Sequence, residues 1–135
     1  MSMEIRIEHL NSTKFAATVR GHRLICDQPP SNGGADEGPT PPEFLLASLG
    51  TCAGFYAASY MKNHGLTLPL GVSVKAEKAS APARLAKFQI EIDCPGLPHE
   101  HEAGLLRSVN ACLIKNTLAH PPVIETVLVS ALITA

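Results

Sequence analysis

The chain has 135 residues, 45% of them hydrophobic and 17% charged, with eleven basic and twelve acidic residues and a formal net charge of −1. This composition is typical of a globular protein, and a chain of this length buries roughly 65–70% of the surface that its unfolded form exposes. The charge balance and the absence of tryptophan argue against a nucleic-acid-binding protein, and no basic run indicates a membrane-binding patch. We therefore expect a single domain over residues 1–135, with neither nucleic acid nor membrane as a partner.

The N-terminus and the cysteines bear on the compartment. The first residues alternate charged and apolar side chains and lack the apolar core of a signal peptide. We also find no apolar run of about 20 residues, the length that spans a bilayer. The four cysteines, at positions 26, 52, 94 and 112, form no Cys-x-x-Cys pair and no zinc-type spacing. We expect a cytoplasmic protein whose cysteines begin as free thiols.

The first quarter of the chain predicts an antiparallel meander. Apolar and polar residues alternate over Glu4–Leu10, with Ile5 and Ile7 on one face, which is the pattern of a half-buried strand. Two further strands are predicted over Lys14–Arg20 and His22–Asp27. Residues 28–39 are rich in Pro, Gly, Asn and Asp and are predicted to be a loop.

A long helix is predicted to follow this loop. Thr40 and Glu43 have the spacing of a capping box, with Pro41 at the first helical position. The helical pattern continues to Asn63, after which Gly65 provides a left-handed stop. The apolar stripe of this helix consists of Leu45, Leu49, Cys52 and Tyr56.

The second half of the chain predicts a hairpin, a helix and a final strand. Half-buried strands are expected over residues 72–77 and 88–93, joined by a long loop over Lys78–Lys87. A second helix is predicted from about Glu100 to His120, before two prolines that end it, and a buried strand from Val123 to Thr134. The predicted order is β-β-β-α-β-β-α-β, an α+β fold.

Two cysteines occupy equivalent places in the two predicted helices. Cys52 follows leucines at 45 and 49, and Cys112 follows Leu105 and Val109 with the same spacing. If the two stripes face one another, the thiols can meet, but composition alone favours two inert core cysteines, because free cysteine is among the most buried residue types. Gly50 and Gly54 weaken the first helix, which indicates that something packs close to its backbone beside Cys52.

The other thiols and the histidines form no recognisable ligand pattern. Cys94 shares the inward parity of its strand, and Cys26 lies in a strand whose facing is open, so both are interpreted as structural. His99 and His101 alternate in a polar segment and are interpreted as solvated surface rather than a metal site. No metal and no cofactor are therefore predicted.

A reactive Cys52 needs a cation or a hydrogen-bond donor, since burial in an apolar helix opposes ionisation of its thiol. Arg20, Arg23 and Arg84 are the candidate cations. Glu43 is a candidate for orienting such an arginine, although the capping box alone explains its presence.

Two segments give the chain a resemblance to the OsmC/Ohr family of thiol-dependent peroxidases. One is residues 38–52, which run from Gly-Pro-Thr-Pro-Pro-Glu into the helix and end in Cys52; the other is residues 111–118, in which Cys112 is followed by Leu-Ile-Lys-Asn-Thr-Leu. The family often has proline directly after its second cysteine, where this chain has Leu113.

The resemblance implies a fold, an assembly and a mechanism. It implies an intertwined homodimer with two active sites at the subunit interface. Cys52 would be the peroxidatic cysteine that a hydroperoxide substrate oxidises to a sulfenic acid, and Cys112 the resolving cysteine that condenses with it to a disulfide. A dithiol reductant would reset the pair. Arg20 is the best match by position for the family's activating arginine, with Glu43 beside it in the site. The alternative is a noncatalytic OsmC-like domain that binds a small apolar ligand at the dimer interface.

Overall fold

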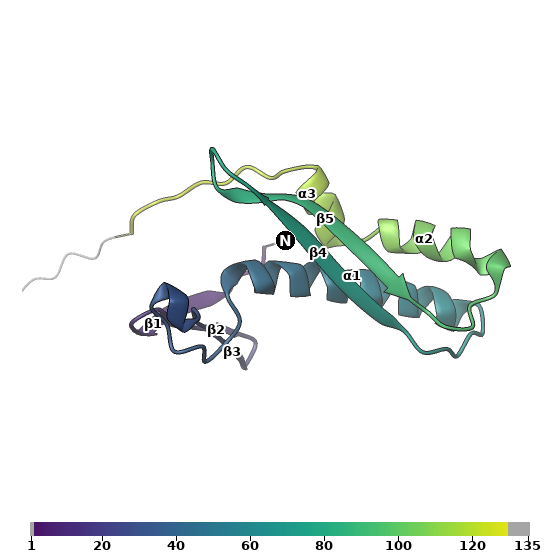
Figure 1. Ribbon diagram of the computed structural model, residues 1–135, viewed down its shortest axis with the longest axis horizontal. Coiled ribbons are helices and arrows are strands. Elements are labelled where there is room, and N and C mark those ends of the chain that lie inside the picture. Colours follow the sequence, from purple (N-terminus) through teal and green to yellow (C-terminus); the bar gives the residue numbers. More distant parts are fainter. Residues whose placement is uncertain (1, 130–135) are drawn as a thin grey trace, which may run out of the picture.

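The computed structural model describes residues 2–129. In chain order they form a three-stranded meander, a long helix, a hairpin and two short helices (Figure 1). This mixed arrangement confirms the predicted α+β class. The elements are β1 Arg6–Asn11, β2 Lys14–Val19, β3 His22–Cys26, η1 Pro30–Asn32, α1 Pro41–Asn63, β4 Gly71–Ala79, β5 Arg84–Asp93, η2 His99–His101, α2 Glu102–Asn110 and α3 Leu113–Ala119.

The meander forms as predicted, but its apolar face is not buried within the chain. β2 pairs antiparallel with both β1 and β3. Ile5 and Ile7, predicted to be half-buried, are 49% and 51% exposed. The reason is that α1 touches this face only at its start, through Pro41 and Phe44. Figure 1 shows the meander at one end of the molecule, beside the start of α1.

Helix α1 begins and ends where local chemistry predicts. Thr40 and Glu43 form the reciprocal capping box, and Gly65 adopts the left-handed conformation with φ +67° just after the helix. Contrary to our expectation, α1 is by length and composition apolar enough to cross a membrane, with a mean hydropathy of 1.3. Core helices of globular proteins also meet this criterion, and α1 contributes Leu49 and Ala53 among other residues to the core.

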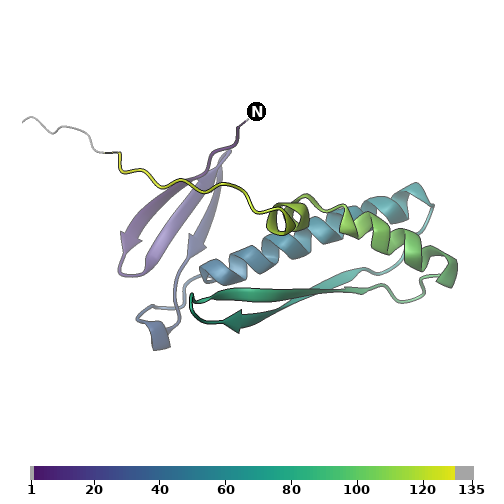
Figure 2. The same cartoon turned by 90° about the horizontal axis from the view of Figure 1, so that it is seen from above.

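The β4–β5 hairpin carries α1 and α2 on one of its faces (Figure 2). The loop between its strands is shorter than predicted, because the ladder continues to the pair Ala79 and Arg84. The core consists of small and branched residues from both helices packed against the hairpin: Ala53, Ala57, Leu105 and Val109.

One of the two glycines in α1 has a steric explanation. A Cβ atom at Gly50 would lie 3.0 Å from Val74 Cγ2, which is tight, whereas one at Gly54 would lie 3.6 Å from Val72 Cγ2, an ordinary contact distance. The close neighbour predicted from these glycines is therefore β4, and only Gly50 is needed for its approach. Both glycines lie about 200° around the helix from Cys52, so they bring the hairpin close without opening space at the thiol.

The predicted second helix is two helices separated by a break. α2 ends at Asn110, and Cys112 has φ −54° and ψ +127°, which is extended backbone, before α3 begins at Leu113. No proline or glycine marks this position. The reason for the break lies in the tertiary contacts of Cys112, described below.

The predicted final strand is absent from the described part of the chain. Residues 123–129 belong to no strand, and Leu128 and Val129 are 93% and 88% exposed. Alternating apolar residues form a strand only where another strand supplies hydrogen-bond partners, and the described chain pairs none with this segment. The remainder of the prediction, residues 130–134, lies outside the described residues.

Candidate active site

The fold brings Cys52 and Cys112 together. Cys52 lies in the middle of α1 and is half-buried, while Cys112 is fully buried at the start of α3. The side chain of Cys112 lies close enough to Cys52 for each thiol to shift the pKa of the other. Of the two possibilities that the sequence left open, the structure therefore favours a paired arrangement over two separate core cysteines.

The break before α3 turns backbone donors toward this pair. Cys112 is the N-cap of α3, and its sulfur accepts a hydrogen bond from the Lys115 N–H at 3.5 Å. The N–H groups at the start of a helix have no partner within it. Those of Leu113 and Ile114 lie near Cys52 and lower its pKa. A continuous helix would have used these N–H groups in its own hydrogen bonds, so the break is what makes them available.

The two thiols differ in acidity. Burial raises the pKa of Cys52, but the hydrogen bonds from Cys112 and from the backbone of Ile114 and Leu113 outweigh it, so that the pKa lies below its ordinary value. Burial also raises the pKa of Cys112, and the hydrogen bond to Cys52 raises it further. Cys52 is thus the thiol that ionises first, and Cys112 keeps its proton and donates it to the Cys52 sulfur.

This arrangement has the components of a thiol–disulfide couple. A thiolate is the nucleophilic form of cysteine, and a second thiol in contact can condense with it after oxidation. All four cysteines are free in this structure. Reduced Cys52 and Cys112 can therefore form a disulfide if an oxidant reaches Cys52.

Glu43 lies away from the thiol pair and serves the helix start. Its carboxylate accepts hydrogen bonds from the backbone N–H of Thr40 at 2.9 Å and from the Thr40 hydroxyl at 2.8 Å. These two bonds hold the pKa of Glu43 below its ordinary value. Nine residues of helix, about 13.5 Å of axial rise, separate it from Cys52. Within the described chain, Glu43 therefore caps the start of α1.

No arginine acts on Cys52 within the described residues of this single chain. The groups that shift its pKa are a thiol and two backbone N–H groups. Arg20 is exposed in the turn between β2 and β3, and Arg23 is exposed on β3. Arg84 donates to the carbonyl oxygens of Ser80 and Pro82 in the hairpin loop.

The histidines that we considered as metal ligands are engaged elsewhere. His101 Nδ1 is 2.9 Å from the Tyr60 hydroxyl, and His64 stacks on the Tyr60 ring. His99 pairs with Glu102 at 3.3 Å. Over residues 2–129 no three histidine, cysteine or acidic side chains gather in a way that could hold a metal ion.

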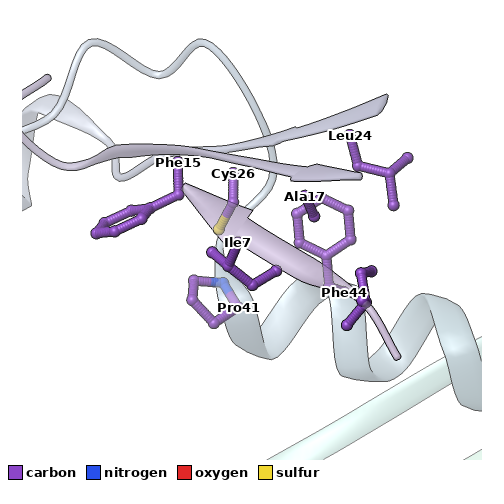
Figure 3. Close-up of a pocket in the computed structure, with 8 residues that line it drawn as sticks. Ile7, Phe15, Ala17, Leu24, Cys26, Pro41 and Phe44 are labelled. Carbon is purple, nitrogen blue, oxygen red and sulfur yellow. The ribbon is translucent and has the colours of Figure 1, made fainter. Parts of the chain in front are cut away.

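The other two cysteines have different surroundings. Cys94 is partly buried and donates to the Met61 sulfur at 3.9 Å, which agrees with a structural role. Cys26 lines an apolar pocket of about 530 Å³ on the meander, together with Phe15, Leu24 and Phe44 among others. Figure 3 shows these side chains facing the pocket, the Cys26 sulfur among them.

One buried carboxylate was not anticipated from the sequence. Asp27 is 2% exposed and accepts hydrogen bonds from the Thr13 hydroxyl at 2.6 Å and from the backbone N–H groups of Gln28, Ala35 and Glu37. These bonds, that from Thr13 foremost, lower its pKa to about 2. Asp27 therefore fixes the loop that leads into α1.

Comparison with known proteins supports the resemblance in sequence. A sequence model of OsmC-like proteins matches residues 33–127. None of the curated proteins matches the chain significantly.

Several solved structures share the fold at low sequence identity. An OsmC-like protein from Mycoplasma pneumoniae has 19% identity and a TM-score of 0.73, over 90% of this chain and 89% of its own. A protein from Psychrobacter arcticus assigned to osmotic stress and detoxification has 17% identity and a TM-score of 0.78, over 87% and 89%. An organic hydroperoxide resistance protein from Elizabethkingia anophelis has 15% identity and a TM-score of 0.64, over 90% and 91%. The chain belongs to the OsmC-like protein family.

Proposed function

We propose that this protein is a thiol-dependent peroxidase that reduces organic hydroperoxides or hydrogen peroxide. The observation that carries the proposal is a neighbouring pair of thiols with opposite pKa shifts: the pKa of Cys52 is lowered and that of Cys112 is raised. A peroxidatic cysteine must be ionised to attack, and a resolving cysteine must wait beside it. Family membership and the hydroperoxide resistance of a protein with the same fold support the same reading.

The reaction proceeds in three steps. The Cys52 thiolate attacks one oxygen of the hydroperoxide, the O–O bond breaks, and the other oxygen leaves as an alcohol, or as water from hydrogen peroxide, after taking up a proton. Cys52 is then a sulfenic acid. Cys112 attacks the Cys52 sulfur, forms the disulfide and releases water. An external dithiol reduces this disulfide by exchange and becomes a disulfide itself, which restores both thiols.

We further propose that the working protein is a homodimer. The apolar face of the meander and the apolar residues after α3 are exposed in the single chain, with Ile7 at 51% and Leu128 at 93%. Elements of this kind bury their apolar faces against other elements, and an identical chain supplies both surfaces. In the dimer an arginine from the partner chain, with Arg20 as the first candidate, would face Cys52.

Peroxide consumption with a dithiol reductant tests the catalytic proposal. We expect wild-type protein to consume an organic hydroperoxide catalytically, and Cys52→Ser to consume none above the uncatalysed rate. Cys112→Ser should keep the first oxidation of Cys52 but lose efficient turnover, because the sulfenic acid has no resolving thiol beside it. If wild type and Cys52→Ser consume peroxide at the same rate, the peroxidase proposal is wrong.

The competing possibility is a noncatalytic domain that binds a small apolar ligand. The pocket on the meander, with its almost wholly apolar lining, is the feature that favours it. A ligand in this pocket would bind equally to wild type and Cys52→Ser, whereas peroxidase activity would be lost in the variant. The same pair of proteins therefore separates the two functions.

A further inference from the structure

Within one chain, the exposed aromatic residue on the outward face of α1 lies too far from the meander pocket to enter it. The pocket is lined by side chains of the meander and by Pro41 and Phe44 at the start of α1. Phe55, the most exposed aromatic residue of the described chain, lies on the same helix and is 66% exposed. Its backbone is about 21 Å of helical rise beyond Pro41, so Phe55 cannot enter the pocket of its own chain.

Phe44 and Phe55 share one side of α1. They are eleven residues apart, which places them about 20° from each other around the helix axis. Between them, the same side carries only small side chains: Ala47, Ser48 and Thr51. A face with small residues between two aromatic ones allows a second helix to approach closely at its middle.

Two-fold symmetry then relates the two aromatic residues. In a symmetric dimer, if residue i contacts residue j of the partner, residue j also contacts residue i. When two copies of α1 pack antiparallel with the axis midway between positions 44 and 55, Phe55 of each chain lies beside Phe44 of the other. Phe44 forms part of the pocket wall (Figure 3), so the incoming ring reaches the pocket itself.

We propose that the meander pocket is the socket for Phe55 of a second copy of this chain, with the thiol of Cys26 beside the inserted ring. The inference rests on the homodimer of the proposed function and deepens it by naming the contact that joins the chains. The pocket volume of about 530 Å³ accommodates an aromatic side chain, and its lining is almost entirely apolar. Two such contacts would be made in each dimer, because the symmetry repeats them.

A disulfide between engineered and native positions tests the contact. Phe55→Cys is combined with Cys52→Ser, Cys94→Ser and Cys112→Ser, so that Cys26 is the only other thiol. After mild oxidation with diamide, we expect most chains to form a covalent dimer on a non-reducing gel, and mass spectrometry to identify a peptide that links positions 26 and 55. A disulfide needs Cα atoms within about 7 Å. Position 55 lies about 21 Å of helical rise beyond Pro41, which lines the same pocket as Cys26, so a bond between positions 26 and 55 must join two chains.

Two controls define the specificity of this cross-link. Adding Cys26→Ser should abolish it, which excludes a bond between two copies of position 55. Replacing Ser73, exposed on the hairpin, with cysteine instead of Phe55 should give no link to Cys26. If light scattering shows a dimer but no link forms between positions 26 and 55, this inference is wrong and the homodimer proposal is unaffected. A small ligand retained in the pocket would have the same two consequences.

A second variant decides the matter if the multiply substituted protein fails to fold. Phe55→Ala in the otherwise unaltered chain should raise the dimer dissociation constant at least tenfold by sedimentation analysis, because aromatic residues buried in pockets dominate interface energetics. An unchanged dissociation constant would overturn the proposal. Monomeric wild-type protein would overturn both it and the homodimer, while peroxide consumption by Cys52 is measured independently.

Discussion

Replacing Leu113 with proline is expected to slow alkylation of Cys52 while leaving the fold intact. Leu113 is the first residue of α3, a position where proline is well tolerated. Cys112 before it has φ −54° and ψ +127°, the extended conformation that a following proline requires. Leu113 is also 63% exposed, so little packing is lost. The substitution therefore removes one backbone N–H and little else.

The size of the effect follows from the lost hydrogen bond. A hydrogen bond to a charged group contributes about 1.5–3 kcal/mol, and 1.36 kcal/mol corresponds to about tenfold. Cys52 is only half-buried, and the Leu113 N–H is one of three groups that lower its pKa, so we take the lower end of this range. This corresponds to about a tenfold smaller thiolate population below neutral pH. A less acidic thiol is a stronger nucleophile once ionised, and this raises the rate of each thiolate by about threefold. Alkylation should be about three- to fourfold slower.

The assay is the pH dependence of iodoacetamide alkylation, followed at the Cys52 peptide by mass spectrometry. The matched control is Leu113→Ala, which removes the same side chain and keeps the N–H. We expect the profile of Leu113→Pro to move to higher pH and that of Leu113→Ala to stay with wild type. If the two variants give identical profiles and both are folded, the backbone donor does not activate Cys52 and the reasoning is refuted.

Four further substitutions probe the site and its framework. Cys112→Ser should let peroxide drive Cys52 to sulfinic or sulfonic acid, detected by mass spectrometry; an unmodified Cys52 would contradict the assigned roles. Gly104→Ala should lower the free energy of unfolding in urea by about 1 kcal/mol, because its Cβ would lie 2.5 Å from a tyrosine hydroxyl and overpacking exceeds the helix gain. Gly54→Ala, with 3.6 Å to its nearest neighbour, should instead raise it by up to about 1 kcal/mol. The carboxyl group of Asp27 has its pKa lowered to about 2 from an ordinary 3.8, so its contribution to stability is complete above about pH 4 and is lost as the pH falls toward 2; Asp27→Asn should lack this acid dependence in thermal unfolding.

Local chemistry in the sequence determined the first half of the fold. The capping box of Thr40 and Glu43 set the start of α1, and the alternating pattern set the three strands before it, because both signals act between residues that are neighbours in the chain. The sequence also showed that Cys52 and Cys112 share one spacing in their apolar stripes, and in the structure each thiol shifts the pKa of the other.

Only the tertiary structure decided how the site is activated and which faces remain open. The break at Cys112 carries no local signal, and the N–H groups that it directs to Cys52 belong to the backbone, which every residue but proline has. The alternating pattern predicted correctly that Ile7 lies on the apolar face of its strand, but that face is exposed in the single chain. Periodicity identifies the apolar face of a strand and does not show what covers it. For the same reason the apolar segment from Val123 was expected to be a strand, although in the described chain it has no strand to pair with. Short-range pattern thus specified the elements, and long-range packing specified which backbone and side-chain groups meet.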